Sequence, residues 1–301
     1  MLMLTLCAYS LHIAHALVAR APAPRMNVVD FMPFWENNFF TVEPTYTIRD
    51  WAAARSIMAE YLDSVRTERG AMFSGWTICD DKLFCREAFH DAGAVVDHMA
   101  NVKPTIEKLL AGVATLESVE LHGPPSDLPK CAEAMAPFDA ATRSFEIDSG
   151  CTFIVRPYAG MSRGQSHFSI HPRFTVSDWS AARPLLDETV ARMKLTSGCI
   201  YFGWSRCGDD LVCRQAFTNA EGVRSHLDSV GALIEQLASG PATLDSLSVH
   251  GPSTRLGECK AVLGEKYGVG VSPRYFALDS GFQKFEITGY NLGMLDYSKF
   301  D

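Results

Sequence analysis

The chain has 301 residues, of which 47% are hydrophobic and 21% charged, and this ordinary globular composition excludes a disordered, collagen-like or coiled-coil protein. Because the length is about twice that of a usual domain, it predicts two domains. Lys and Arg total 27 against 35 Asp and Glu, and no basic run occurs, so nucleic acid is not an expected partner.

Residues 1–25 resemble a targeting leader that is removed from the mature chain. The first 29 residues contain no Asp or Glu, and 2–19 is largely apolar. Small-residue patterns near its end suit a signal peptidase, whereas the Ala and Pro residues between Arg20 and Arg25 are also typical of a plastid transit sequence. We expect a protein that is secreted or directed to an organelle, otherwise soluble, and without a membrane span in the mature chain. The alternative is an apolar N-terminus that is retained.

The sequence contains one segment twice. Residues 44–124 align with 172–252 at a constant offset of 128 without a gap, and 33 of the 81 aligned positions are identical. The alignment predicts a first repeat at 39–155, a linker at 156–166, a second repeat at 167–288 and a C-terminal tail at 289–301.

Both repeats predict the same order of elements, because their apolar residues change from alternating to helical spacing at the same points. In the first repeat, Asp50 and Asp91 stand at predicted helix N-caps. The predicted elements are a strand at 40–48, a helix at 51–65, a hairpin at 72–89, a helix from 91 to 112, a strand at 116–122, a short helix at 128–135 and an extra strand at 144–147.

This order, β-α-β-β-α-β, is the ferredoxin-like arrangement of the α+β class, in which both helices cover one face of an antiparallel sheet. Alternating aromatic residues on the other face would leave a large apolar patch unless a second sheet covered it. We therefore predict two tandem ferredoxin-like repeats packed sheet to sheet as an intramolecular dimeric α/β barrel. The alternative is two independent domains joined by the linker.

The end of the hairpin and the start of the second helix read REAFHDAGAVVDH in the first repeat and RQAFTNAEGVRSH in the second. These segments resemble the antibiotic-biosynthesis-monooxygenase (ABM) type of dimeric α/β barrel, and the resemblance covers most of both repeats. That family includes cofactor-free quinol and anthrone oxygenases, haem-degrading enzymes and members without established chemistry. The cysteine pairs on the hairpins are not part of its general pattern.

His98 and His226 lie on the apolar stripe of the second helix of each repeat. Each is either a core histidine or, in the pocket that the resemblance implies between sheet and helices, a neutral base with a lowered pKa. Such a base would deprotonate a phenol or quinol and give an anion that reacts directly with O2, without a cofactor or a metal.

The hairpins carry further candidates. Trp76 with Arg86, and Trp204 with Arg214, are predicted walls of a substrate pocket, the indole stacking on an aromatic ring and the guanidinium stabilising an oxyanion. The alternative is a core tryptophan beside a solvated arginine. His122 and His250 end the fourth strands and are either turn residues or substrate-binding residues at the pocket rim.

Cysteines repeat at the same spacing, Cys79 with Cys85 and Cys207 with Cys213. Each pair is a disulfide candidate if its two residues lie directly opposite one another across the hairpin, and otherwise consists of reduced packing cysteines or takes part in metal or redox chemistry. The sequence contains no phosphate-binding loop, no H-E-x-x-H zinc motif and no C-x-x-C motif, and we assign no metal site.

The sequence favours a cofactor-independent monooxygenase-like protein that acts on a small aromatic or quinol-type molecule with His98 and His226 as bases. The alternative is a non-catalytic module that binds haem through one histidine, or a hydrophobic metabolite. A third possibility is a structural unit whose pockets are filled.

Overall fold

The computed structural model describes residues 31–34, 39–155, 167–266, 270–287 and 290–296. The predicted leader at 1–25 and the predicted linker at 156–166 therefore lie outside the described residues. No helix in the described ranges is long and apolar enough to cross a membrane.

The first repeat follows the predicted order of elements. The side chain of Asp50 accepts a hydrogen bond from the backbone N–H of Ala53, and Asp91 does the same for Ala94, so both predicted N-caps are confirmed. The elements are β2 (Phe40–Ile48), α1 (Trp51–Val65), β3 (Ala71–Cys79), β4 (Lys82–Phe89), α2 (Ala92–Leu110), β5 (Ala114–Gly123), the 3-10 helix η2 (Leu128–Cys131), α3 (Ala132–Met135), the 3-10 helix η3 (Ala136–Ala141) and β6 (Thr142–Val155).

The second repeat has the same order, and Asp178 and Asn219 cap its two main helices. Its elements are β7 (Phe168–Val176), α4 (Trp179–Met193), β8 (Cys199–Cys207), β9 (Asp210–Phe217), α5 (Ala220–Ser239), β10 (Ala242–Pro252), α6 (Leu256–Lys266) and β11 (Arg274–Ile287). Two further strands were not predicted: β1 (Phe31–Phe34) pairs with β6, and β12 (Tyr290–Asp296), within the predicted tail, pairs with β11.

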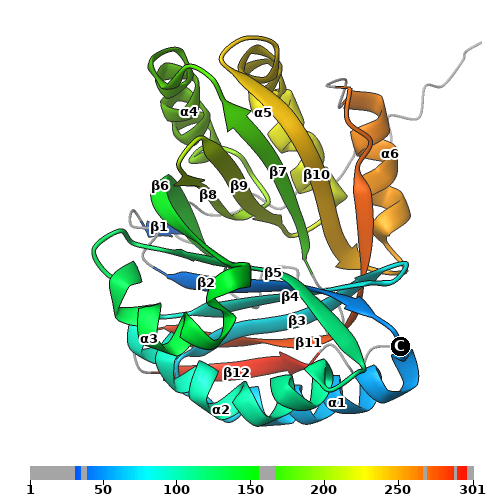
Figure 1. Ribbon diagram of the computed structural model, residues 1–301. Coiled ribbons are helices and arrows are strands. Elements are labelled where there is room, and N and C mark those ends of the chain that lie inside the picture. Colours follow the sequence, from blue (N-terminus) through cyan, green and yellow to red (C-terminus); the bar gives the residue numbers. More distant parts are fainter. Residues whose placement is uncertain (1–30, 35–38, 156–166, 267–269, 288–289, 297–301) are drawn as a thin grey trace, which may run out of the picture.

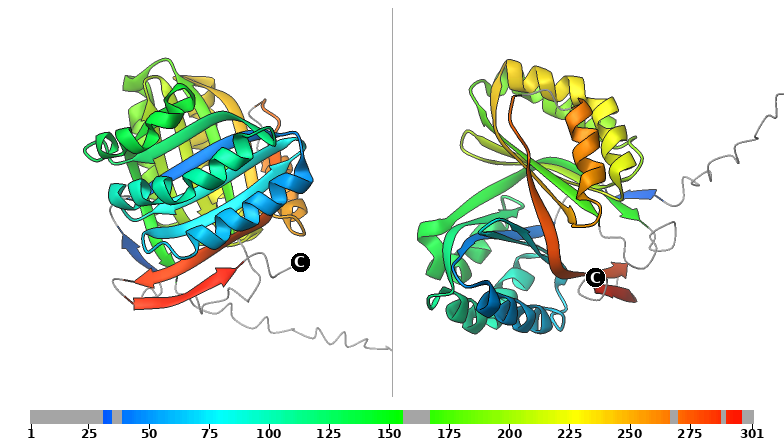
Figure 2. Two further views of the ribbon diagram at one scale, coloured as in Figure 1. Left: turned by 60° about the horizontal axis from the view of Figure 1, so that its bottom comes forward. Right: turned by 90° about the vertical axis from the view of Figure 1, so that its right-hand side faces the viewer.

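Ten strands close into one barrel, in the order β6-β5-β2-β4-β3-β11-β10-β7-β9-β8, with β8 pairing back onto β6. The helices of each repeat cover the outside of their own sheet, and the two sheets face each other (Figures 1 and 2). The predicted fold class, two ferredoxin-like repeats forming an intramolecular dimeric α/β barrel, is confirmed. The alternative of two independent domains is wrong.

The last strand of each repeat joins the two sheets. β6 begins parallel to β5 of its own repeat and continues antiparallel to β8 of the other, while β11 begins parallel to β10 and continues antiparallel to β3. Two equivalent ion pairs link these strands to the opposite repeat, Arg183 with Asp148 and Arg55 with Asp279. Each repeat therefore depends on the other to complete its sheet.

The molecule has three interior regions. One apolar core lies between each sheet and its own helices, which accounts for two of these regions. The third region is the inside of the barrel. The aromatic residues expected on that inner face are present, among them Phe84, Phe145 and Phe276, but the face is not wholly apolar. It carries buried polar and charged side chains from both repeats, among them Glu43, Arg86, His122, Arg214 and His250.

Candidate active site

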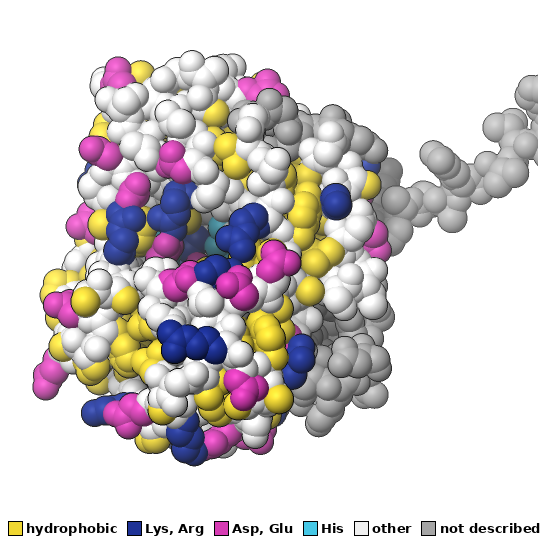
Figure 3. Space-filling view, turned by 45° about the vertical axis from the view of Figure 1, so that its right-hand side comes forward, with side chains coloured by type: hydrophobic (Ala, Val, Ile, Leu, Met, Phe, Trp, Pro, Cys, Tyr) yellow, Lys and Arg dark blue, Asp and Glu magenta, His cyan; other side chains and the backbone are white. Residues whose placement is uncertain are grey.

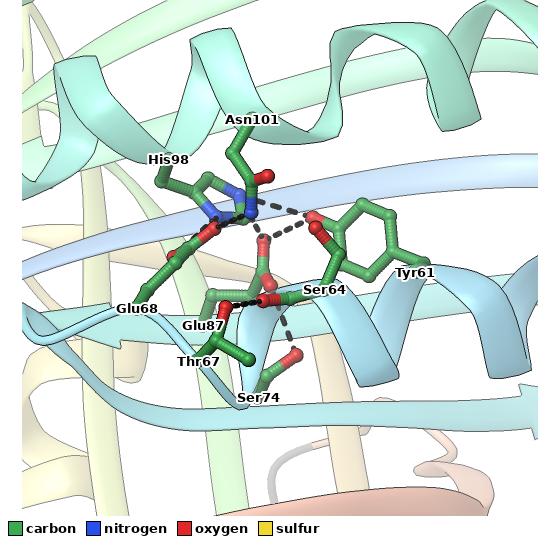
Figure 4. Close-up of polar contacts among 8 residues, drawn as sticks. All are labelled: Tyr61, Ser64, Thr67, Glu68, Ser74, Glu87, His98 and Asn101. Atoms are coloured by element: carbon green, nitrogen blue, oxygen red, sulfur yellow. Dashed lines mark hydrogen bonds and ion pairs between the residues drawn. The ribbon is translucent and has the colours of Figure 1, made fainter.

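Three polar side chains from different elements of the first repeat meet beneath its helices. Tyr61 comes from α1, His98 from α2 and Glu87 from β4, and all three are buried (Figure 4). They meet here because Tyr61 and His98 lie on the apolar stripes that pack each helix onto the sheet.

The three side chains form a closed network. The Tyr61 hydroxyl donates to Glu87 Oε2 at 2.7 Å and lies 3.0 Å from His98 Nε2, which is itself 3.1 Å from Glu87 Oε2. Ser74 donates to the other oxygen of Glu87 at 2.9 Å. The Glu87 carboxylate is therefore held in one orientation by three groups, as in a preorganised site.

A second carboxylate faces the other side of the imidazole. His98 Nδ1 lies 3.0 Å from Glu68 Oε2, and Asn101 donates to Glu68 Oε1 at 2.6 Å (Figure 4). Burial alone would lower the pKa of His98, but the charges and hydrogen bonds of Glu87 and Glu68 outweigh it and raise that pKa to about 9. At neutral pH His98 is thus an imidazolium that donates through both nitrogens.

This finding corrects the predicted role of His98. A lowered pKa was expected, whereas the pKa is raised, so at neutral pH the protonated ring holds no free lone pair. The carboxylate of the network is that of Glu87. Burial, together with the Glu87 charge, raises the pKa of Tyr61 well above its usual range, so Tyr61 is a neutral donor.

The network borders a small cavity. It has a volume of about 20 Å³, close to the space that one water molecule needs. Its polar lining is Glu87, His98, Tyr61 and Tyr46, and its apolar lining is Val42, Pro44, Met99, Ile106, Leu116, Val119 and Phe138.

The second repeat lacks this network. At the positions of Tyr61, Glu68, Ser74 and Glu87 it has Thr189, Thr196, Phe202 and Gln215. His226 packs against Phe217 and Phe202 and lies 3.0 Å from the sulfur of Met193. Burial lowers the pKa of His226 to about 3, as expected for a neutral imidazole, but it contacts an apolar core rather than a polar cavity.

The structure separates the tryptophans from the arginines. Trp76 and Trp204 pack in the two helix-side cores, whereas Arg86 and Arg214 point into the barrel. The register of the hairpin explains this. Trp76 pairs with Cys85, and Arg86 pairs with Gly75, which are neighbouring cross-strand pairs. Side chains of neighbouring pairs lie on opposite faces of a sheet. The prediction that they flank one patch is wrong.

His122 and His250 lie inside the barrel and are completely buried, so neither is an exposed turn residue. His122 stacks on Phe145, and His250 stacks on Phe276. Burial and the nearby Arg214 guanidinium lower the pKa of His122, which keeps its ring neutral.

The cysteine pairs do not form the predicted disulfides. The hairpin turn has two residues, so Cys79 lies opposite Lys82 while Cys85 lies opposite Trp76, and the second repeat has the same register. All eight cysteines in the described ranges are free thiols. Burial raises the pKa of Cys85 and Cys213 well above the usual range, so both are unreactive packing groups.

Sequence reasoning missed Tyr61, Glu68 and Glu87. Tyr61 stands within α1 and Glu68 in the segment that follows it, and neither belongs to a motif, whereas Glu87 is part of the REAF segment but was given no role. A signal was nevertheless present, because all three differ from their counterparts in the second repeat while His98 does not. Comparing the two repeats position by position would have found them.

The strand order of the barrel defines an α+β protein of the dimeric α/β barrel class. Solved structures resemble it. A Fusobacterium nucleatum protein provisionally named a monooxygenase matches 70% of this chain and 90% of its own, at 8% identity and a TM-score of 0.48. An anthrone oxidase-like protein matches 88% and 96% at 12% identity and a TM-score of 0.37. A haem-binding protein from Thermus thermophilus matches 72% and 91% at 7% identity and a TM-score of 0.39.

No protein-family model and no curated protein sequence matches the chain. At these identities the similarities concern overall architecture, and the fold assignment rests on the strand order of the barrel itself.

Proposed function

We propose that the first repeat oxidises a small aromatic, quinol-type molecule with O2, in the manner of cofactor-independent monooxygenases. The observation that supports this most directly is the buried network of Tyr61, Glu87 and His98 at the edge of a cavity. A carboxylate base beside a fixed cation and a neutral hydroxyl suits removal of a proton from a phenol.

Each member of the network has a distinct role in the proposal. Glu87 accepts the proton of the substrate hydroxyl. The His98 imidazolium and the Tyr61 hydroxyl then stabilise the resulting oxyanion, which is electron-rich enough to react with O2. Because the site is shielded from water, these electrostatic interactions are stronger than they would be in solvent.

A cavity of about 20 Å³ does not hold an aromatic ring. In the proposal, substrate enters by displacing Met99 of α2 and Phe138 of η3, both of which line the cavity. Methionine adapts readily to such a change because its side chain is unbranched and flexible.

The haem alternative does not fit either helix-side histidine. Both ring nitrogens of His98 face carboxylates at 3.0 to 3.1 Å, so neither has a lone pair directed at an iron. His226 is enclosed by aromatic and sulfur-containing side chains. We therefore derive no reaction step through haem.

The test is oxygen uptake by the full chain with anthrone or a naphthohydroquinone, after subtraction of the uncatalysed rate. Glu87→Gln removes the base and His98→Gln removes the positive charge. Each is expected to lower kcat/KM by about 100-fold or more. Tyr61→Phe keeps the ring packing and is expected to give a smaller loss, about tenfold.

His226→Gln is the matched control, since it makes the same change at the equivalent position of the second repeat. We expect it to leave kcat/KM within about twofold of wild type once folding has been verified by circular dichroism. Equal losses in His98→Gln and His226→Gln, or no oxygen uptake by the wild-type chain with either substrate, would contradict the proposal.

A further inference from the structure

A cleft opens into the barrel where the two repeats meet. It has a volume of about 360 Å³ and is lined by β2, β4 and β5 of the first repeat and by β7, β9, β10 and the start of β11 of the second. Figure 3 shows its mouth as a hollow with a histidine at its base and charged side chains of both signs around it. This space is separate from the network of His98.

Two carboxylates lie side by side in this cleft. Glu43 on β2 and Glu120 on β5 are direct cross-strand partners, and both side chains point into the barrel. Like charges at such positions repel each other. Arg173 binds Glu120 Oε1, which leaves Oε2 of that carboxylate to face His122 Nε2 at 3.4 Å.

Two imidazoles complete the cluster. One potential ligand atom from each of Glu43, Glu120 and His122 lies within 4.8 Å of the others. From the opposite side of the barrel, His171 on β7 brings its Nδ1 to 3.5 Å from Glu43 Oε2. The four side chains thus converge from three strands and both repeats.

His122 has no hydrogen bond that explains its burial. Its side chain is completely buried, and neither ring nitrogen has a hydrogen-bond partner, although Nε2 lies 3.4 Å from Glu120 Oε2. His171 takes part through Nδ1, which faces Glu43, whereas its unsatisfied nitrogen is Nε2. Since almost all buried polar atoms in proteins are satisfied, the unsatisfied Nε2 of His122 indicates a ligand of the cluster.

We propose that Glu43, Glu120, His122 and His171 bind one first-row divalent transition-metal ion at the floor of this cleft. Two imidazole nitrogens and two carboxylate oxygens form a donor set typical of Zn²⁺, Mn²⁺, Fe²⁺ or Co²⁺ and unlike that of Mg²⁺ or Ca²⁺, which prefer oxygen ligands alone. Arg173 holds the Glu120 carboxylate in place from outside the cluster.

Among the residues that the structure describes, the second repeat forms no equivalent site, so we expect this cluster to bind one ion per chain. Ser248 stands where the first repeat has Glu120, and His171 itself stands where it has Glu43. His250, the counterpart of His122, is already hydrogen-bonded to Thr77 at 2.9 Å and to Ser248 at 3.0 Å.

The test is titration of the metal-free full chain with ZnCl2 by calorimetry and with CoCl2 by visible absorption, which reports the ligand field of bound Co²⁺. We expect one Zn²⁺ per chain and a Co²⁺ spectrum with nitrogen ligation. Glu43→Gln, His122→Gln and Glu120→Ser are each expected to weaken Zn²⁺ binding by tenfold or more. Glu120→Ser introduces the residue that the second repeat has at the equivalent position, Ser248. This variant still tests the proposal if a glutamine variant does not fold.

Two controls match these changes. Glu117→Gln alters a carboxylate of the same cleft and strand that pairs with Lys82, and His250→Gln alters the equivalent histidine. Both are expected to bind Zn²⁺ within twofold of wild type. Absence of stoichiometric binding by the wild-type chain, or equal binding by wild type and Glu120→Ser, would overturn the proposal. Neither outcome bears on the oxidation proposed for the first repeat, because none of these residues contacts its network.

Discussion

Raising the pH from 6.5 to above 9 is expected to lower the free energy of unfolding by about 3 kcal/mol through His98. This imidazole has a pKa of about 9 in the folded chain, because Glu87 and Glu68 stabilise its charged form, and a value near 6.5 when unfolded. One pH unit between the two values corresponds to about 1.4 kcal/mol.

The direction follows from proton binding. Between pH 6.5 and 9 the folded chain keeps the proton on His98 while the unfolded chain loses it, so unfolding releases a proton and becomes easier as the pH rises. The stabilisation is fully present below 6.5 and is lost as the pH passes through 9. His226 acts in the opposite range: its pKa of about 3 makes the fold less stable as the pH falls below 6.5.

Urea unfolding of wild type and His98→Gln across this pH range measures the effect. Wild type should lose about 3 kcal/mol more than the variant between pH 6.5 and 9, and subtracting the variant removes the contribution of thiols that ionise only when unfolded. His226→Gln should retain the wild-type loss. Parallel curves for wild type and His98→Gln would show that His98 is neutral in the folded chain.

The overall fold could be predicted because both repeats report the same pattern. Apolar spacing identified each strand and helix, and repetition at an offset of 128 implied two sheets that could cover one another. The exchange of β6 and β11 between the sheets is not visible in such spacing. The exchange depends on the residue at which a strand changes its pairing partner. Asp148 on β6 and Asp279 on β11 lie near this point, and neither residue reveals the change by itself.

The site could be predicted only in part. The helical stripe correctly placed His98 beneath α2, but its charge state depends on carboxylates from β4 and from the segment after α1, Glu87 and Glu68. These residues are far apart in sequence and come together only through tertiary packing. The hairpin residues were misplaced for another reason, because a shift of one residue along a strand moves a side chain to the opposite face.

The two repeats have diverged in different ways on their two faces. On the helix side, the first repeat has a polar network where the second has an apolar core around Trp204 and Phe202. Inside the barrel, Glu43 and Glu120 lie on the first repeat and His171 on the second. One repeat thus provides the candidate active site, whereas the candidate metal site requires both.

Replacing Phe282 by alanine is expected to lower the free energy of unfolding by about 3 to 5 kcal/mol. Phe282 belongs to β11 of the second repeat, yet its completely buried ring lies in the apolar core of the first. Its backbone pairs with Ser74 on β3, the strand next to the one that carries Glu87. The cavity left by the ring would therefore lie in the core of the first repeat rather than in that of the second.

Hydrogen exchange locates that loss. In Phe282→Ala, amides of α1 and β3 should exchange faster, while those of α4 and β8 change little. Cys151→Ala is the matched variant, because Cys151 occupies the equivalent place on β6, pairs with Phe202 and packs in the second repeat's core. It should cost only about 1 kcal/mol and loosen α4 and β8 instead. Faster exchange in α4 and β8 of Phe282→Ala would mean that each last strand stabilises its own repeat, and the two halves would then not depend on each other through exchanged strands.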